Sequence, residues 1–234
     1  MSETTVADNQ QKFRCDFCQR DFRRESTLFA HLCEPKRRHR ERDEVGVQLG
    51  LQAYLRFYEI TQGSARLKTW DDFATSAYYR AFVRYGRYCQ STRVVNVSAF
   101  TDWLIHNNVK LDTWCRDQVY SNYLIQHIRK ESVEDALKRA LETALEWQER
   151  TGNPSADYLR FGNDNGICHD ITRGRITAWT VYNSASGQEF LSRINQEQIS
   201  IIWPWIDADS WQRCFQDRPA DQAYVQEILT QAGW

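Results

Sequence analysis

Cys15 and Cys18, separated by two residues, restrict the fold of this chain more strongly than any other pair. Cysteines at this spacing sit on a tight turn and offer two thiolates to one tetrahedral metal ion. Phe22, Leu28 and His31 follow in an order that supplies a small apolar core and a third metal ligand. A module of this size cannot fold on apolar burial alone, whereas zinc binding contributes about 10–16 kcal/mol at neutral pH. The sequence therefore predicts a zinc-dependent module near the N-terminus.

The segment from 12 to 39 has the pattern F-x-C-x2-C-x3-F-x5-L-x2-H, and in this it resembles the C2H2 zinc-finger family. The resemblance implies a ββα module and a Zn²⁺ ion held by Cys15, Cys18, His31 and one further residue. The pattern departs from the family at that fourth position. Seven residues separate His39 from His31, where the family has about three to five.

Two side chains compete for the fourth ligand position, Cys33 and His39. On a continuous helix Cys33 would point about 200° away from His31. Pro35 disfavours helix at Glu34, so we expect the helix to end early and to let either side chain turn back. We favour His39, because the longer connection allows it to close the tetrahedron, and we keep Cys33 as the alternative.

Basic side chains are concentrated in the same segment. Ten basic residues oppose five acidic ones between Lys12 and Arg42, which gives this part about +5 within a chain of net charge -1. A basic N-terminal segment followed by an acidic remainder is typical of a chain whose basic end binds a polyanion. A single finger covers only about three base pairs, so we expect it to contact phosphates more than bases. The expected contacts are Arg24, Lys36, Arg37, Arg38, Arg40 and Arg42; the alternative for the cluster from 36 to 42 is a solvated linker.

The rest of the chain predicts a mainly α fold. Apolar residues recur at helical intervals after Asp43, and the pattern becomes mixed from residue 155. Two apolar stretches around Thr172-Arg173-Gly174 predict a small β-hairpin over 167–179. We therefore expect a disordered tail over 1–11, the finger with its basic extension over 12–42, a helical domain over 43–152, and a mixed α+β part over 153–234 that packs on the helical domain.

Two local clusters in the body suggest chemistry. The Cys-His-Asp run at 168–170 can form a nucleophile set or a metal site, but alternating strand faces separate its members, so we favour a buried cysteine and a surface histidine. Arg80, Arg84 and Arg87 share one helical face. They form either a backbone-binding surface with the tyrosines between them or the outer side of an amphipathic helix.

These features favour zinc-dependent nucleic-acid binding, with DNA as the preferred polymer. No apolar run reaches the length of about 20 residues that a membrane helix needs, and the polar start of the chain does not resemble a secretory signal. We therefore expect an intracellular, cytoplasmic protein with no membrane partner. One alternative is a protein-interaction adaptor, and the helical body is in any case a possible contact for a protein partner.

A second alternative is an enzyme that acts on DNA or a nucleotide and uses the finger only for delivery. The finger-plus-helical-body layout, with the stretch His31-Leu32-Cys33-Glu34-Pro35-Lys36-Arg37-Arg38-His39, is similar to uncharacterised zinc-finger proteins of large bacteriophages. That resemblance implies a role in modifying DNA bases or nucleotides. It identifies no catalytic residue in this chain.

Overall fold

The computed structural model describes residues 12–63 and 67–234, and its mainly α-helical fold confirms the prediction from the sequence. The chain divides into two compact units, residues 1–91 and residues 92–234. The disordered tail expected over 1–11 lies outside the described residues. The domain boundaries expected at 42 and 152 remain predictions.

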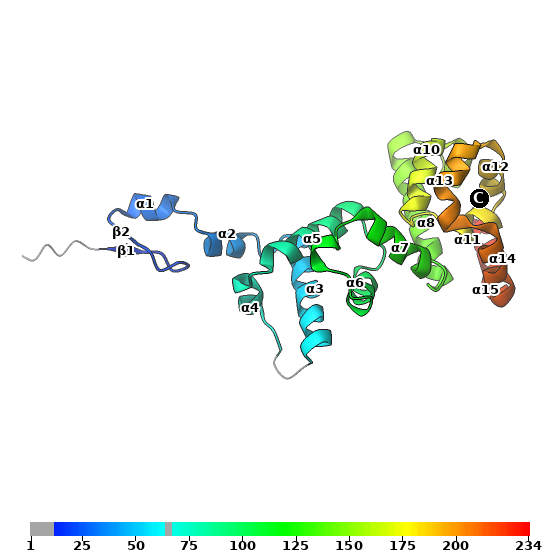
Figure 1. Cartoon of the computed structure of the whole chain (residues 1–234). Helices are drawn as coiled ribbons and strands as arrows, with labels where there is room; N and C mark the ends of the chain where they lie inside the picture. Colours follow the sequence, from blue (N-terminus) through cyan, green and yellow to red (C-terminus); the bar gives the residue numbers. More distant parts are fainter. Residues whose placement is uncertain (1–11, 64–66) are drawn as a thin grey trace, which may run out of the picture. The chain divides into compact units, whose positions relative to one another are not determined.

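The N-terminal unit begins with a small ββα module and continues as helices (Figure 1). The two strands pair antiparallel, with Phe13 opposite Phe22 and Arg14 opposite Asp21. The helix of the module begins at Glu25. The elements of this unit are β1 (Phe13–Arg14), β2 (Asp21–Phe22), α1 (Glu25–Ala30), α2 (Glu34–Arg40), α3 (Val45–Gln62), α4 (Trp70–Thr75) and α5 (Tyr79–Thr92).

Glycines allow α3 and α5 to touch backbone to backbone. A Cβ atom on Gly86 of α5 would lie 2.0 Å from the carbonyl oxygen of Gly46 and 2.5 Å from the nitrogen of Gly50, both on α3. Farther along the crossing, the rings of Tyr54 and Phe82 meet edge to face with their centroids 5.5 Å apart. This close packing fixes α5, which carries the three arginines that share one face.

The C-terminal unit consists of helices among the described residues. α11 lies at its centre and contacts α8, α12 and α15. Its Trp179 is fully buried and packs against Trp211 and Phe215, with ring centroids 5.9 and 5.0 Å away. The helices are α6 (Val97–His106), α7 (Asp117–His127), α8 (Val133–Thr151), α9 (Tyr158–Phe161), α10 (Asp164–Thr172), α11 (Ala178–Asn183), α12 (Ala185–Arg193), α13 (Gln196–Ile206), α14 (Ala208–Asp217) and α15 (Pro219–Gln231), with two short 3-10 turns, Leu111–Thr113 and Ser155–Asp157.

The β-hairpin predicted over 167–179 is wrong, because these residues belong to α10, a turn and the start of α11. Asn163 caps α10 by accepting a hydrogen bond from the Gly166 backbone. Ile167 and Ile171 are both buried, and they lie one helical turn apart. A short apolar run fits a helix face as well as it fits a strand, and periodicity alone does not separate the two.

The close contact of α3 and α5 at their glycines predicts how a larger residue there changes the free energy of unfolding. Gly86→Ala should lower the unfolding free energy of the N-terminal unit by about 1–3 kcal/mol, since the new methyl group meets the α3 backbone. The matched control is Gly166→Ala in α10, where the nearest atoms to a new Cβ are 3.8 Å away. That substitution should be neutral or stabilising, because alanine favours helix over glycine. Urea denaturation followed by circular dichroism measures both, and a stabilised Gly86→Ala variant would contradict the packing.

Candidate metal centre

Four potential metal ligands are brought together by the connections around β1, β2, α1 and α2. Cys15 directly follows β1, and Cys18 lies on the turn that leads to β2. The turn closes through two backbone hydrogen bonds, from Cys15 to the Arg20 carbonyl at 3.0 Å and from Gln19 to the Cys15 carbonyl at 2.8 Å. His31 caps the end of α1, and the next ligand precedes α2. Each ligand therefore sits at the end of an element, where a single ion can tie the elements together.

The donor atoms of Cys15, Cys18, His31 and Cys33 all lie within 4.8 Å of one another. The Cys15 and Cys33 sulfurs are 3.9 Å apart, and the Cys18 sulfur is 3.2 Å from Nε2 of His31. Ligands about 2.3 Å from a tetrahedral zinc ion are separated by roughly 3.8 Å, so the spacing fits. Three thiolates and one imidazole are a donor set that zinc prefers. This cluster can hold one metal ion.

Cys33, the alternative fourth ligand, and not His39 completes the cluster of donor atoms, so the geometry favours Cys33 over the C2H2 composition that the resemblance implies. The reason lies in the backbone. α1 ends at Ala30, and both His31 (φ -71°, ψ 122°) and Cys33 (φ -81°, ψ 163°) are extended. In an extended segment residues two apart point to the same side, so Cys33 faces the site together with His31. His39 instead lies on α2, with its ring centroid 5.1 Å from that of Phe17.

The surroundings of Cys15 favour the thiolate that a metal requires. The backbone N–H of Cys18 lowers the pKa of the buried Cys15 thiol, burial opposes this, and the N–H of Phe17 adds to the lowering. The net pKa lies below the ordinary value for cysteine. Metal ligation needs deprotonated sulfur, so these backbone donors prepare the site for a cation.

The predicted phosphate-binding residues divide into two kinds. Arg24 and Arg40 are exposed. Arg37 is exposed but pairs with Glu34 and Glu41, and Lys36, Arg38 and Arg42 also have contacts within the protein. Lys36 donates to the His31 carbonyl at 3.1 Å, and the Arg42 guanidinium lies 5.0 Å from the Trp70 ring centroid.

Arg38 connects α2 to two other helices. It donates to the Ala74 carbonyl of α4, and its guanidinium lies 4.3 Å from the centroid of the Tyr79 ring on α5. It also pairs with Glu34 at 3.1 Å. Most of the Arg38 side chain is therefore covered, and its contacts position α2 within the unit.

A charged groove of about 380 Å³ lies between α2 and α5. Four arginines line it, of which Arg80 pairs with Glu34 at 3.3 Å and Arg87 pairs with Glu41 at 3.5 Å. Burial opposes ionisation of Glu34, but hydrogen bonds from Arg38 and Arg37 hold its pKa below the ordinary value. The acidic side chains of this groove were not predicted from the sequence. The signal for them is Glu34 followed three and four residues later by Arg37 and Arg38, a spacing at which a helix brings opposite charges together.

Tyr79 also lines this groove. Tyr79 is 4% exposed, and its hydroxyl has no hydrogen-bond partner among the described residues. Burial, with the nearby charge of Glu41, raises the pKa of this phenol, so the hydroxyl keeps its proton and is a donor. A buried donor without an acceptor is costly, so this hydroxyl lowers the stability of the packing between α2 and α5.

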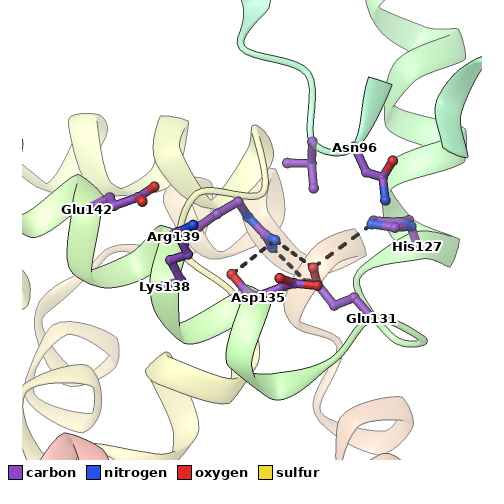
Figure 2. Close-up of a pocket in the computed structure, with 8 residues that line it drawn as sticks. Asn96, His127, Glu131, Asp135, Lys138, Arg139 and Glu142 are labelled. Atoms are coloured by element: carbon purple, nitrogen blue, oxygen red, sulfur yellow. Dashed lines mark hydrogen bonds and ion pairs between the residues drawn. The ribbon is translucent and has the colours of Figure 1, made fainter. Parts of the chain in front are cut away.

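A second polar pocket, of about 400 Å³, lies within the C-terminal unit between the end of α7 and the start of α8 (Figure 2). There Arg139 clamps the buried carboxylate of Glu131 through two hydrogen bonds of 2.6 and 2.8 Å. Nε2 of His127 is 4.0 Å from the same carboxylate. Burial, and then the Arg139 charge, lower the pKa of His127. Since Arg139 engages both oxygens of Glu131, this arrangement is a structural ion pair that ties the segment between α7 and α8 to α8.

In the Cys-His-Asp run at 168–170, Nδ1 of His169 lies 3.8 Å from Oδ1 of Asp170, but the three residues form no metal-ligand group among the described residues. Cys168 is buried, and burial raises the pKa of its thiol, which makes it a poor nucleophile. His169 is exposed, while Asp170 accepts a hydrogen bond from the Tyr158 hydroxyl at 2.5 Å. The favoured expectation of a buried cysteine and a surface histidine therefore fits, although on a helix and not on a strand.

Comparisons of the chain with protein-family models, curated proteins and solved structures find no match. Within residues 12–63 and 67–234, no helix has both the length and the apolar character to cross a membrane.

Replacement of each competing ligand separates the two candidates for the fourth position. Cys33→Ser should remove most of the zinc that remains after dialysis, because it deletes one of the clustered donors. His39→Ala should retain about one zinc per chain, since its ring lies against Phe17 and outside the donor cluster. Elemental analysis measures the zinc, and the visible spectrum of the cobalt-substituted protein reports the number of thiolates. Zinc loss in His39→Ala with full zinc in Cys33→Ser would contradict the site.

Proposed function

We propose that this protein binds nucleic acid in a zinc-dependent manner and contacts the phosphate backbone through arginines of the finger and of α2 and α5. The observation that carries the proposal is the groove between α2 and α5, where four arginines meet two glutamates. Guanidinium groups in excess over carboxylates are the groups that bind phosphate oxygens. The same unit carries the metal-ligand cluster.

The proposed zinc site supports the phosphate-binding surface through α2. Cys33 is the residue that precedes α2, and Lys36 of the first turn donates to the His31 carbonyl. An ion held by His31 and Cys33 fixes the backbone from which α2 starts. Loss of the ion releases that end of the helix and the arginines that it presents.

The ion pairs within the groove do not prevent its arginines from binding a phosphate. Arg80 is 77% exposed although it pairs with Glu34, and exposed ion pairs contribute only about 0–1 kcal/mol. A phosphate that approaches with two acceptor oxygens can bind a guanidinium in a bidentate manner, which is stronger. The ion pairs therefore hold the arginine side chains in place, and their guanidinium groups can still donate hydrogen bonds to a phosphate.

The finger by itself is unsuited to reading a base sequence. α1 spans six residues, from Glu25 to Ala30. The positions that face bases in the family carry Arg24, Ser26, Thr27 and Ala30, and only the first is long enough to reach a base edge. Backbone binding with little sequence preference is the mode that these side chains support, on DNA or RNA, with DNA as the preferred polymer.

The salt dependence of affinity tests this proposal. Binding of fluorescein-labelled oligonucleotides, followed by anisotropy from 50 to 200 mM salt, should give a steep linear decrease of log K with log salt. Arg80→Ala should make that slope shallower by about 0.7–0.9, the value of one phosphate contact. The matched control is Arg93→Ala, which removes an exposed, paired arginine of the C-terminal unit and should leave the slope unchanged.

Two outcomes would contradict the proposal. Zinc-loaded protein that binds no oligonucleotide would favour the adaptor alternative. Binding that does not weaken with salt would exclude the phosphate backbone as its basis.

A further inference from the structure

A second groove, of about 510 Å³, lies on the neighbouring face of α2 and is mostly apolar. Pro35, Arg38 and His39 of α2 line it, together with Trp70 of α4 and Phe17 of the finger turn. Residues 35, 38 and 39 lie on one side of α2, and this side adjoins the side that carries Arg37 and Glu41. Glu34 lines both grooves. The phosphate-binding groove and this apolar groove are therefore neighbours along one helix.

Aromatic rings from three elements form the groove. Phe17 is 40% exposed, and its ring and that of the exposed His39 are tilted by 47° with centroids 5.1 Å apart. The half-buried Trp70 supplies a ring from α4. Exposed aromatic side chains are costly to leave in water, and three that line one hollow are the kind of surface that stacks a flat, apolar ligand.

Cations lie beside these rings. The Arg42 guanidinium is 5.0 Å from the Trp70 ring centroid, and Arg38 lies where the groove meets its charged neighbour. Among the residues that line this groove, the acids are Glu34, which is paired with Arg37 and Arg38, and Asp71. A ligand that offers a flat ring and a negative charge complements this combination of aromatic and guanidinium groups.

We infer that this groove binds an unpaired nucleobase, whose own phosphate lies over the arginines of the neighbouring groove. The inference rests on the proposed function and adds a strand preference to it. Base stacking on aromatic side chains tolerates any sequence, because every base has a π face. In a duplex both faces of a base are covered by its neighbours, so the protein binds single strands more tightly than duplexes of the same sequence.

The groove assigns a role to His39 that is separate from metal binding. Its ring forms part of the aromatic wall, while the cluster of zinc ligands is complete without it. His39→Ala is therefore expected to keep the metal and to lose part of the stacking surface. This separation makes His39 a test of the groove that does not depend on the zinc site.

The test compares Trp70→Leu with Trp203→Leu, which changes an exposed tryptophan of α13 in the C-terminal unit. Anisotropy titrations use a single-stranded DNA, the single-stranded RNA of the same sequence, the DNA duplex, and a single strand with abasic sites. Trp70→Leu should weaken single-strand binding by about tenfold while leaving the salt slope unchanged, because it removes stacking and no phosphate contact. Trp203→Leu should bind like the unchanged protein.

The abasic strand isolates the base from the phosphate. The unchanged protein should bind it more weakly than the intact strand, and Trp70→Leu should bind the two strands alike. Circular dichroism checks the fold of Trp70→Leu, and His39→Ala, at an exposed position, should weaken single-strand binding several-fold with its zinc retained. The DNA and RNA arms identify which polymer supplies the base.

The results separate the inference from the function on which it rests. Salt-sensitive binding that is equal for single strands, duplexes and abasic strands would overturn the base groove and leave the proposed function intact. Single-strand affinity that is unchanged in both Trp70→Leu and His39→Ala would do the same. Failure of every oligonucleotide to bind the zinc-loaded protein would overturn both, and an apolar peptide would become the better occupant.

Discussion

The finger at the start of the N-terminal unit lacks an apolar core of its own, and its one cluster of donor side chains can hold a metal ion in place of that core. Between Lys12 and Glu44, Cys15 is the one buried residue, and neither α1 nor α2 buries a side chain fully. Folded modules of this size need a metal or a disulfide to offset their conformational entropy. The sulfurs of Cys15, Cys18 and Cys33 and the imidazole of His31 are the donors that can hold such a metal.

Everything proposed for this protein follows from where that cluster places α2. The helix starts at the residue after Cys33, and its faces point toward different partners. One face carries Arg37 and Glu41 toward the arginines of α5, and the other carries Pro35 and His39 toward Trp70. Glu34 connects them, because it pairs with Arg37 and Arg38 on its own helix and with Arg80 on α5. Charge and aromatic surface thus meet along a single short helix.

The sequence predicts the local parts of this arrangement. The spacing of Cys15, Cys18 and His31 predicts three of the clustered ligands. Local spacing is informative there because a tight turn and a single helix turn relate these residues directly. Spacing alone does not decide the fourth ligand and leaves both His39 and Cys33 open. The extended backbone at Cys33, where the side-chain period is two, is what turns Cys33 toward the cluster.

The remaining parts depend on contacts between residues that are distant in the sequence. Nothing near Trp70 indicates that it lies in one groove with His39 and Phe17, since α4 reaches α2 only after the long helix α3. In the C-terminal unit, the short apolar runs of α10 and α11 fit strands and buried helices equally well. The central position of α11, around Trp179, decides between them, and this position is a property of the whole unit.

Removal and return of the metal in a single sample is the most direct test of the central claim, that zinc binding organises a nucleic-acid-binding surface. Anisotropy of a labelled single strand bound to the full chain would be followed as a chelator is added and zinc is then restored. Affinity is expected to fall with the loss of metal and to recover when about one zinc per chain is bound again. Affinity that is unchanged in the metal-free protein would contradict it.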